Sequence, residues 1–387
     1  MEYTIPLHRI AAKAQGITER FLARVAYPGT PITPGVRTVL SLHSGNDGLH
    51  LSDLQGYAAI LQSPDTLDNI DSVPLLLGVP NLSTISEGSI VAISPTGRIH
   101  TLYRPESRFN TIFATGQCNS NCLMCSQPPT DDHIPSLVKE HHELLSLIRE
   151  PPSHLGISGG EPTLLGDGLV DILSAISGRF PDTPVTMLTN GRRFQDIVFT
   201  RSLAESAPKE FLTAIPLYAD TPSLHDWIVQ IRGAFQQTVF GLYNAARSGL
   251  TVEIRVVLHK LSIPRLVHLM NFIYRNFPFV CHVALMGLEH MGYVKKNWEL
   301  LWIDPVDYQK ELIEAAKHLH YRGVPFSIYN LPLCIVPPEL RSFARQSISD
   351  YKNIYVGTCD SCTVRTECSG LFASSKERHS RGIQAIT

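Results

Sequence analysis

The sequence predicts an α/β protein built around a parallel sheet that is either open or closed into a partial barrel. From about residue 109, short apolar runs typical of strands alternate with longer segments whose apolar residues follow helical spacing. Repeated strand–helix units of this kind pair their strands in parallel. One of the strands, "TVEIRVVL" at 251–258, is polar on one face only. The chain has 387 residues, of which 43% are apolar, so it can bury a large core.

Composition excludes several classes of partner. The formal net charge is -2, only 18% of residues are charged, and no long run of one sign occurs, so we expect neither nucleic acid nor a membrane surface as partner. The sequence contains no run of about eighteen apolar residues, so no membrane span is predicted. The first residues, "MEYTIPLHRIAAKAQG", lack an apolar signal region, so we expect a cytoplasmic protein. Clustered cysteines in that compartment are more often metal ligands or redox groups than disulfides.

Residues 1–108 predict a small β-rich domain. They are rich in Gly, Pro, Ser and Asp, with short apolar runs between them. The segment "EGSIVAISPTGRIHTLYRP" predicts two strands, 90–94 and 99–103, joined by a Pro-Thr-Gly turn. No role for this domain follows from its sequence.

Residues 109–329 predict the alternating core. The expected strands are "TIFAT", "HLGIS", "PVTMLTN", "FLTAIPLY", "TVEIRVVL", "FVCHVALM" and "VPFSIY". Helical spacing predicts helices at 134–148, 169–176, 194–206, 235–248 and 265–276. A further helix reaches Arg322, because Asp304 and Pro305 are good residues for its N-cap and first position.

The strand at 251–258 indicates what the sheet encloses. Its alternate residues Thr251, Glu253, Arg255 and Val257 lie on one face, and the opposite face is wholly apolar. A strand that is covered on both faces is usually apolar on both. The polar face therefore predicts a barrel lumen that holds a ligand. The alternative is an edge strand whose polar face meets water.

Three cysteines follow the first core strand directly. "CNSNCLMC" places Cys118, Cys122 and Cys125 at C-x3-C-x2-C spacing. Structural zinc normally takes four protein ligands, and the nearest imidazole, His133, lies beyond a Pro-Pro pair. Three thiolates on a 4Fe–4S cube would leave one iron without a protein ligand and free to bind a substrate or cofactor. The spacing therefore favours an open iron–sulfur site.

This spacing after a strand resembles the signature of the radical SAM superfamily. "SGGEP", which follows the second strand, resembles the family's glycine-rich motif for S-adenosylmethionine (SAM), and "TNG" ends the third strand. "VALMGLEHMG" resembles the later segment that packs on adenine. The resemblance implies a partial (β/α)6 barrel with a 4Fe–4S cluster on the three cysteines. Met124 departs from the pattern, because many members have an aromatic residue there.

The resemblance also implies cofactor contacts. In such enzymes the amino and carboxylate groups of SAM chelate the open iron. The glycines allow close approach of the backbone, and Glu161 would accept a hydrogen bond from the methionine amine. The cofactor-binding residues implied in this way are Gly159, Gly160, Glu161, Pro162, Thr189, Asn190, Arg255 and Gly287. No catalytic side chain is predicted; His225 and Asp226 are candidates to face a substrate, although a helix cap explains Asp226 equally well.

The tail, residues 330–387, holds a second group of cysteines. Cys334, Cys359, Cys362 and Cys368 supply four thiolates, which can close the coordination of a second 4Fe–4S cluster or of one zinc ion. The pattern resembles a shortened auxiliary-cluster domain of the SPASM or twitch type. The eighth cysteine, Cys281, lies in an apolar strand, so we expect it to be a small buried core residue.

A closer resemblance concerns one subgroup, the radical SAM maturase of the His-Xaa-Ser repeat system. It rests on "ISPTGRIHTLYRP", "CNSNCLMCSQPP" and the cysteine pattern of the tail. It implies reductive cleavage of SAM to a 5′-deoxyadenosyl radical that modifies a ribosomally made peptide or protein. The partners would be that substrate, a second radical SAM maturase and an electron donor such as flavodoxin or ferredoxin. The alternatives are a radical SAM enzyme acting on a small molecule, and a zinc or iron–sulfur scaffold without catalysis.

Overall fold

The computed structural model describes residues 9–42, 54–64, 73–346 and 353–387. The chain divides into two compact units. Unit 1 comprises residues 1–112, 133–156 and 175–183, and unit 2 comprises residues 113–132, 157–174 and 184–387. The domain boundaries expected at residues 108 and 329 stay predictions.

Unit 1 contains an eight-stranded sheet in the order β1-β8-β7-β3-β4-β5-β6-β2. Its two outermost strands, β1 and β2, are separated in sequence by Ala12 alone, so a single stretch of chain pairs with both ends of the sheet. The sheet therefore closes on itself as a small barrel. The strands are β1 (Arg9–Ala11), β2 (Lys13–Gln15), β3 (Phe21–Ala26), β4 (Thr38–Leu42), β5 (Ala59–Gln62), β6 (Leu75–Leu77), β7 (Ile90–Ile93) and β8 (Arg98–Tyr103).

The expected β-hairpin is part of this barrel. β7 and β8 pair antiparallel at the predicted place, with Ile93 opposite Ile99. Alternate residues of β3, such as Ala23 and Val25, enter an apolar core of buried side chains. Helix α1 (Ile134–Leu147) belongs to the same unit, and Arg20 binds the Glu140 carboxylate through two nitrogens at 2.9 and 2.7 Å. The helix therefore packs with the N-terminal barrel.

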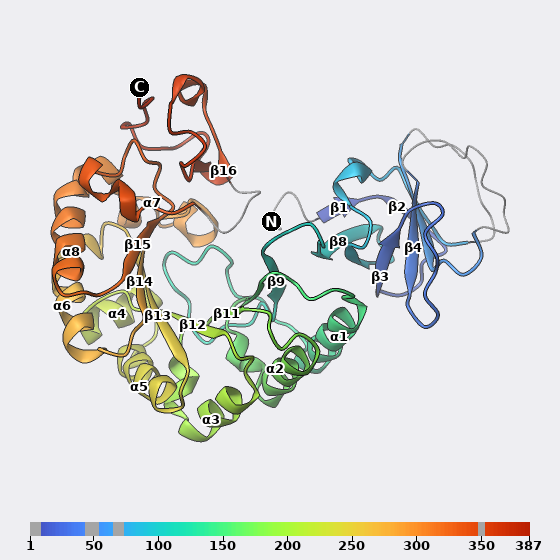
Figure 1. Cartoon of the computed structure of the whole chain (residues 1–387), viewed down its shortest axis with the longest axis horizontal. Coiled ribbons are helices and arrows are strands. Elements are labelled where there is room, and N and C mark those ends of the chain that lie inside the picture. Colours follow the sequence, from blue (N-terminus) through green and yellow to red (C-terminus); the bar gives the residue numbers. More distant parts are fainter. Residues whose placement is uncertain (1–8, 43–53, 65–72, 347–352) are drawn as a thin grey trace. The chain divides into compact units, whose positions relative to one another are not determined.

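A second sheet has seven strands in the order β15-β14-β13-β12-β11-β10-β9 (Figure 1). The pairs from β11 to β15 are all parallel. The sequence predicted each of these strands, and the α/β class with a parallel, curved sheet is confirmed. The strands are β9 (Asn110–Phe113), β10 (Leu155–Ser158), β11 (Val185–Leu188), β12 (Phe211–Pro216), β13 (Thr251–Leu258), β14 (His282–Gly287) and β15 (Phe326–Tyr329).

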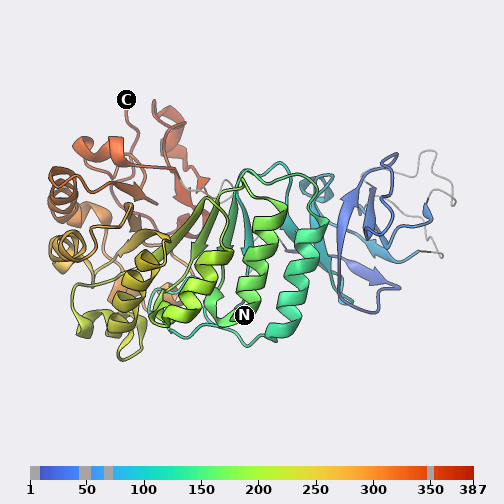
Figure 2. The same ribbon diagram turned by 60° about the horizontal axis from the view of Figure 1, so that its bottom comes forward.

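Helices cover one face of this sheet and lie side by side across it (Figure 2). Two of them begin as helix-start signals predict. Asp196 accepts hydrogen bonds from two amides of α3, and Asp304 accepts one from Val306 in the short turn before α8. The helices are α2 (Asp167–Arg179), α3 (Ile197–Ser206), α4 (Pro222–Val229), α5 (Ala234–Arg247), α6 (Leu266–Asn276), α7 (Trp298–Leu301) and α8 (Gln309–Tyr321).

The polar face of β13 points away from these helices. β13 lies between β12 and β14, so the edge-strand alternative is wrong. Its apolar residues Val252, Ile254 and Val256 are fully buried on the helix side. Glu253 and Arg255 alternate with them on the opposite face of β13, as expected for a strand that lines a lumen.

The tail folds after β15 and contains the short pair β16 (Asn353–Ile354) and β17 (Leu371–Phe372). One expectation about the remaining cysteine is wrong. Cys281 is exposed, because β14 begins only at His282 and the thiol precedes the strand instead of packing inside it. Within the described part of the chain, no helix is both long and apolar enough to cross a membrane.

Candidate functional site

The three-cysteine loop leaves β9 at its carboxyl end and has neither helix nor strand of its own. Other elements hold its backbone. The amides of Asn121 and Leu123 donate to the last carbonyls of α4 at 3.1 and 2.9 Å. The Cys125 carbonyl accepts from the amide of Tyr293 at 2.8 Å, and the Asn297 side chain donates to the Leu123 carbonyl at 2.8 Å. The loop is thus fixed by segments that follow β12 and β14.

The glycines of "SGGEP" are required by this loop. The amide of Gly160 donates to the Thr115 carbonyl at 2.7 Å, and the amide of Glu161 donates to the Gln117 carbonyl at 2.7 Å. A Cβ on Gly159 would lie 2.4 Å from the Thr115 oxygen, and one on Gly160 would lie 2.2 Å from the Gln117 oxygen. Only glycine permits the backbones to approach so closely. The backbone of the motif therefore binds the backbone at the start of the cysteine loop.

Glu161 joins the two motifs that the sequence assigns to SAM. Its carboxylate is fully buried and accepts from the Thr163 hydroxyl at 2.6 Å, the Thr189 hydroxyl at 2.7 Å and the Asn190 amide at 2.7 Å. The Asn190 side chain in turn donates to the Asn119 side chain of the cysteine loop at 2.6 Å. The carboxylate therefore links "GGEP" to "TNG" through hydrogen bonds. A carboxylate has about four acceptor positions, so these contacts leave little capacity for a ligand.

Arg192 is a residue of this site that sequence reasoning missed. Its guanidinium donates to the Ser120 hydroxyl at 3.0 Å and to the Asn119 carbonyl, both in the cysteine loop, and to Gln237 of α5 at 2.7 Å. Burial lowers the pKa of Arg192, but the nearby groups Cys118 and Glu161 oppose this effect. The only signal in the sequence is its position directly after "TNG" at the end of a strand.

The three thiols lie close enough together to influence one another. Burial raises the pKa of Cys118 to about 11 and that of Cys122 to about 12; the neighbouring thiols contribute to both shifts, and the positive charge of Arg192 opposes them. Burial also raises the pKa of Cys125. Such thiols become thiolates when a positive group binds them, and the Cys118 sulfur already accepts from the Ser120 amide at 3.4 Å. The donor set fits an iron–sulfur cluster.

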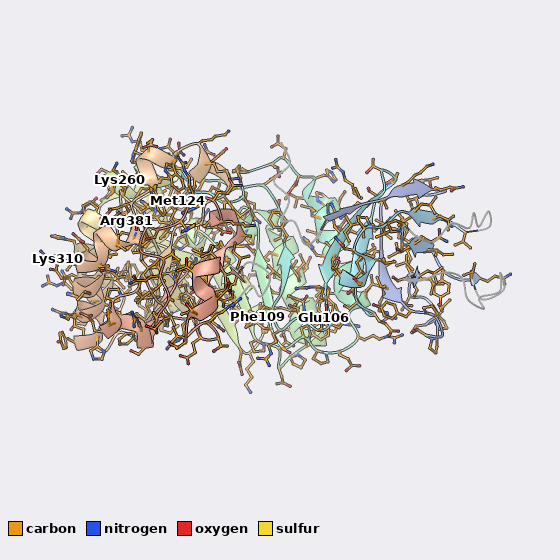
Figure 3. All side chains as sticks on the ribbon, turned by 90° about the horizontal axis from the view of Figure 1, so that it is seen from above. Glu106, Phe109, Met124, Lys260, Lys310 and Arg381 are labelled. Carbon is orange, nitrogen blue, oxygen red and sulfur yellow. The ribbon has the colours of Figure 1, made fainter. Side chains whose placement is uncertain are left out.

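Among the described residues, no three Cys, His, Asp or Glu side chains converge closely enough to surround a single metal ion. In a cubane each thiolate binds a different iron, so the sulfurs need not converge on one point. His133, the nearest imidazole in sequence, is bonded to Ser136 at 2.7 Å. Met124, marked in Figure 3, is buried in an apolar cluster with Ile228, Val294 and Leu301.

The four tail cysteines line one small cavity. The Cys368 sulfur accepts from the amides of Leu333 and Gly370 at 3.3 and 3.4 Å, and the Cys362 sulfur accepts from the Ile386 amide at 3.5 Å. Amide hydrogen bonds to sulfur are a feature of iron–sulfur sites. The cavity is otherwise lined mainly by apolar side chains and Arg365.

The remaining predicted residues lie elsewhere. Pro162 is buried at the start of a short 3-10 turn. Arg255 pairs with Glu253 at 2.7 Å on the inner face of the sheet, and Gly287 ends β14, where its carbonyl accepts from Asn330 at 3.4 Å. In the part of the chain that the structure describes, neither side chain nor carbonyl bonds to the cysteine loop. Asp226 caps α5, because its carboxylate accepts from the amides of Gly233 and Phe235 at 2.5 and 2.8 Å.

Comparison with known families then identifies the core. Residues 112–273 match the family described as the Radical SAM superfamily. This segment is similar to radical SAM domains. The match begins in β9 and ends in α6, so it contains the three cysteines, "GGEP" and "TNG". The matched family implies a 4Fe–4S cluster and SAM.

Several solved structures resemble this chain at low identity. SuiB from Streptococcus suis, bound to S-adenosylmethionine, matches at a TM-score of 0.48 and 17% identity over 66% of this chain and 56% of SuiB. anSMEcpe with AdoMet and the Cp18Cys peptide matches at 0.42 and 18%, over 57% and 62% of the two chains. A radical SAM methyltransferase from Sphaerobacter thermophilus matches at 0.41 and 14%, over 62% and 72%. A search of curated protein sequences finds no match.

Proposed function

We propose that this radical SAM enzyme modifies a ribosomally made peptide or protein, one that carries His-Xaa-Ser repeats. The observation that carries the proposal is the presence of two separate cysteine sites in unit 2. One consists of three thiols at the carboxyl ends of the strands, and the other consists of four thiols that line their own cavity. The resemblance of the cysteine pattern to His-Xaa-Ser maturases supplies the substrate class.

The chain's own residues divide the work of holding the cofactors. Cys118, Cys122 and Cys125 would hold a 4Fe–4S cluster. "GGEP" and "TNG" form the binding surface for SAM, with Glu161 fixing Thr189 and Asn190 in place. When bound, the cluster and SAM supply a 5′-deoxyadenosyl radical that removes a hydrogen atom from the substrate. The protein orients the reactants and excludes water.

The tail site has a different task in this proposal. Its four cysteines close the coordination of a second 4Fe–4S cluster, which can carry electrons or hold structure but leaves no iron open. Zinc is the alternative occupant, since four thiolates suit both. A second radical SAM maturase and an electron donor, flavodoxin or ferredoxin, complete the proposed set of partners.

The test is co-expression of the enzyme with a peptide that carries His-Xaa-Ser repeats, followed by mass spectrometry of the peptide. We expect a mass change that disappears in the Cys118→Ala variant. Cys281→Ala is the matched control, because Cys281 is an exposed cysteine that belongs to neither site. An unmodified peptide beside an enzyme that cleaves SAM would show that the substrate class is wrong, while the radical SAM chemistry stands.

A further inference from the structure

The inner face of β13, β14 and β15 carries a chain of polar side chains that the hydrogen-atom chemistry does not explain. Glu253 is directly opposite His282 in the strand register, and Ser327 is one strand further. His282 Nδ1 lies 2.9 Å from Glu253 Oε2, and His282 Nε2 lies 3.0 Å from Ser327 Oγ. Tyr329 follows two residues after Ser327 on the same face of β15, and its ring centroid is 6.5 Å from that of His282. Glu253, His282 and Ser327 thus form one hydrogen-bonded path across three strands, and Tyr329 lies beside it.

The protons in this path have a defined order. Burial opposes ionisation of Glu253, but the hydrogen bond with His282 and the charge of Arg255 hold its pKa below the usual value. A carboxylate only accepts, so His282 Nδ1 carries the proton that binds it. In the neutral imidazole Nε2 is then an acceptor, and it takes the Ser327 hydroxyl proton. His282 is therefore poised to receive a proton from the direction of Ser327.

Other ionisable groups face this path. Arg255 Nε donates to Glu253 at 2.7 Å. Cys281 is exposed as a residue, but partial desolvation of its sulfur and the nearby Glu253 charge raise the pKa of the thiol. Burial and the Glu253 charge also raise the pKa of Tyr329, while Ser327, Arg255 and Arg345 act in the opposite direction. The phenol is therefore protonated at neutral pH.

Exposure distinguishes a relay from a nucleophilic triad. The order Ser–His–Glu is that of a hydrolytic triad, but Ser327 is only 5% exposed in the middle of a strand, where no carbonyl can reach it. The accessible positions are at the two ends of the path. Tyr329 is the partly exposed last residue of β15. It lies at the carboxyl end of its strand, and the cysteine loop leaves β9 at the carboxyl end of that strand. The His282 side chain is 22% exposed.

We propose that Tyr329, Ser327, His282 and Glu253 form an acid–base relay that takes a proton from an N–H, O–H or S–H group of the peptide in the lumen. The inference rests on the proposed function, which supplies the peptide. Tyr329 is the group that meets the substrate, and His282 holds the proton.

The step transfers a proton and no electron. The substrate X–H bond breaks and its proton passes to the Tyr329 oxygen, while the Tyr329 proton moves to Ser327 and the Ser327 proton moves to His282 Nε2. The substrate group becomes an anion and His282 becomes an imidazolium. The Glu253 carboxylate at 2.9 Å stabilises that positive charge, as an orienting carboxylate does in general-base catalysis.

One arm of the test needs no substrate. Nuclear magnetic resonance of holoenzyme labelled with ¹⁵N-histidine gives the pKa of His282, assigned with the His282→Gln variant among sixteen histidines. The ¹⁵N shifts also show which ring nitrogen of the neutral imidazole carries the proton. We expect it on Nδ1, toward the Glu253 carboxylate, and we expect this preference to weaken in Glu253→Gln, whose amide can donate as well as accept. A His282 protonated on Nε2 instead, or one whose shifts do not respond to Glu253→Gln, would overturn the relay.

The second arm measures coupling with a synthetic His-Xaa-Ser repeat peptide. The readout is the amount of modified peptide formed per 5′-deoxyadenosine. We expect this ratio to fall about tenfold or more in His282→Gln, Tyr329→Phe and Ser327→Ala. Ser327→Thr keeps a hydroxyl on a strand that favours β-branched residues, so it should restore the ratio. His318→Gln on α8 is the control and should match the wild type.

The two arms separate the possible failures. If wild-type enzyme leaves the peptide unmodified, the proposed substrate class fails, and the resonance arm still decides whether the relay exists. If Ser327→Ala lowers stability but leaves the ratio of modified peptide to 5′-deoxyadenosine unchanged, the path is structural and the relay is wrong. A ratio that falls equally in Ser327→Thr and Ser327→Ala contradicts the role of the hydroxyl.

Discussion

The loop with three cysteines and the tail with four differ in what holds them in place. The loop has no regular structure, and its backbone is fixed by α4, by "GGEP" and by the segment after β14. The tail cysteines line a cavity made largely by their own segment, and two of their sulfurs accept backbone amides from it. The first site therefore depends on elements that follow several strands of the sheet. The second is held mainly by its own segment, which suits a group with a structural or electron-carrying role.

The largest effect expected is loss of SAM cleavage when any loop cysteine is changed. Cys118→Ala, Cys122→Ala and Cys125→Ala each remove one of three ligands, and no fourth thiolate is available in the loop to replace it. The reduced, reconstituted variants should form no 5′-deoxyadenosine, as measured by liquid chromatography. Cys281→Ala should match the wild type. Wild-type turnover in any one loop variant would remove that cysteine from the assignment.

The tail site should keep its metal when the loop cysteines are replaced. A variant with all three loop cysteines changed to Ala should keep about four irons, one cubane, because four tail thiolates close its coordination. Its electron paramagnetic resonance signal should not respond to SAM. Cys359→Ala with Cys362→Ala should keep a SAM-responsive cluster but fail to complete the peptide modification. If the loop variant contained stoichiometric zinc and no iron, the proposal of a second iron–sulfur cluster would be wrong. The proposal of a cluster at the three loop cysteines would be unaffected.

Much of the fold of unit 2 follows from local signals. Seven apolar runs with helical segments between them were sufficient to predict β9–β15, and Asp304 was correctly predicted as a helix cap. The start of β14 was predicted too early, because Val280 and Cys281 are apolar and look like strand residues. Closure of the N-terminal barrel was not predicted. It depends on β1 and β2 pairing with distant strands, and such pairing leaves no local trace.

The positions of the cysteines could be predicted from the sequence, but the side-chain contacts of the site could not. Cysteine spacing predicted two sets of ligands, since a loop must supply its thiolates at fixed separations. The four tail cysteines do line one cavity, while both ligand assignments stay predictions. The contacts of Glu161 were not predicted, because Thr189 and Asn190 meet it from 28 and 29 residues away. Arg192 and the pairing of Glu253, His282 and Ser327 were missed for the same reason. Side chains that meet across strands have no periodic signature in a single sequence.

Acid should weaken the loop before the tail. His225 of α4 is buried, its Nδ1 faces the Tyr218 amide at 3.4 Å, and burial lowers its pKa from 6.5 to about 4. Between these values the unfolded chain binds a proton that the folded chain does not. Stability is therefore lost as the pH falls from 6.5 toward 4, by about 1.4 kcal/mol per pH unit and about 3 kcal/mol in all. α4 also accepts the loop amides, so the loop loses its support.

Urea unfolding of wild type and His225→Asn between pH 7 and 4.5 measures this effect. The variant keeps an acceptor for the Tyr218 amide but cannot take up the proton. The difference in unfolding free energy between the two proteins should shrink as the pH falls, and the SAM-responsive signal of the wild type should be lost before the iron of the tail. Parallel curves for the two proteins would contradict the assignment to His225.

A smaller effect is expected from Glu161. Glu161→Ala removes the acceptor that holds Thr189 and Asn190, so SAM binding should weaken by about 1.5–3 kcal/mol, the usual worth of a hydrogen bond to a charged group. The iron content should stay at the wild-type level. Anaerobic calorimetry with SAM and iron analysis of the same sample provide the measurement. Loss of iron with unchanged SAM affinity would assign Glu161 to the cysteine loop alone.

The smallest effect expected concerns charge at the loop, and Arg192→Gln tests it. The guanidinium lies against Ser120 and Asn119, beside Cys118, and its positive charge favours the reduced, more negative cluster. Removing that charge costs the reduced state about 1 kcal/mol, so the midpoint potential should become more negative by about 40 mV.

Arg193→Gln is the matched control, because the Arg193 guanidinium lies 4.4 Å from the Phe199 ring and bonds no loop atom in the described contacts. A redox titration followed by electron paramagnetic resonance measures both variants. Because the described contacts of Arg192 are with the loop and α5 and not with the tail, the tail potential should not move in either variant. An equal shift at both clusters would mean that the substitution acts through the fold, and no shift at the loop would mean that Arg192 holds the backbone without tuning the cluster.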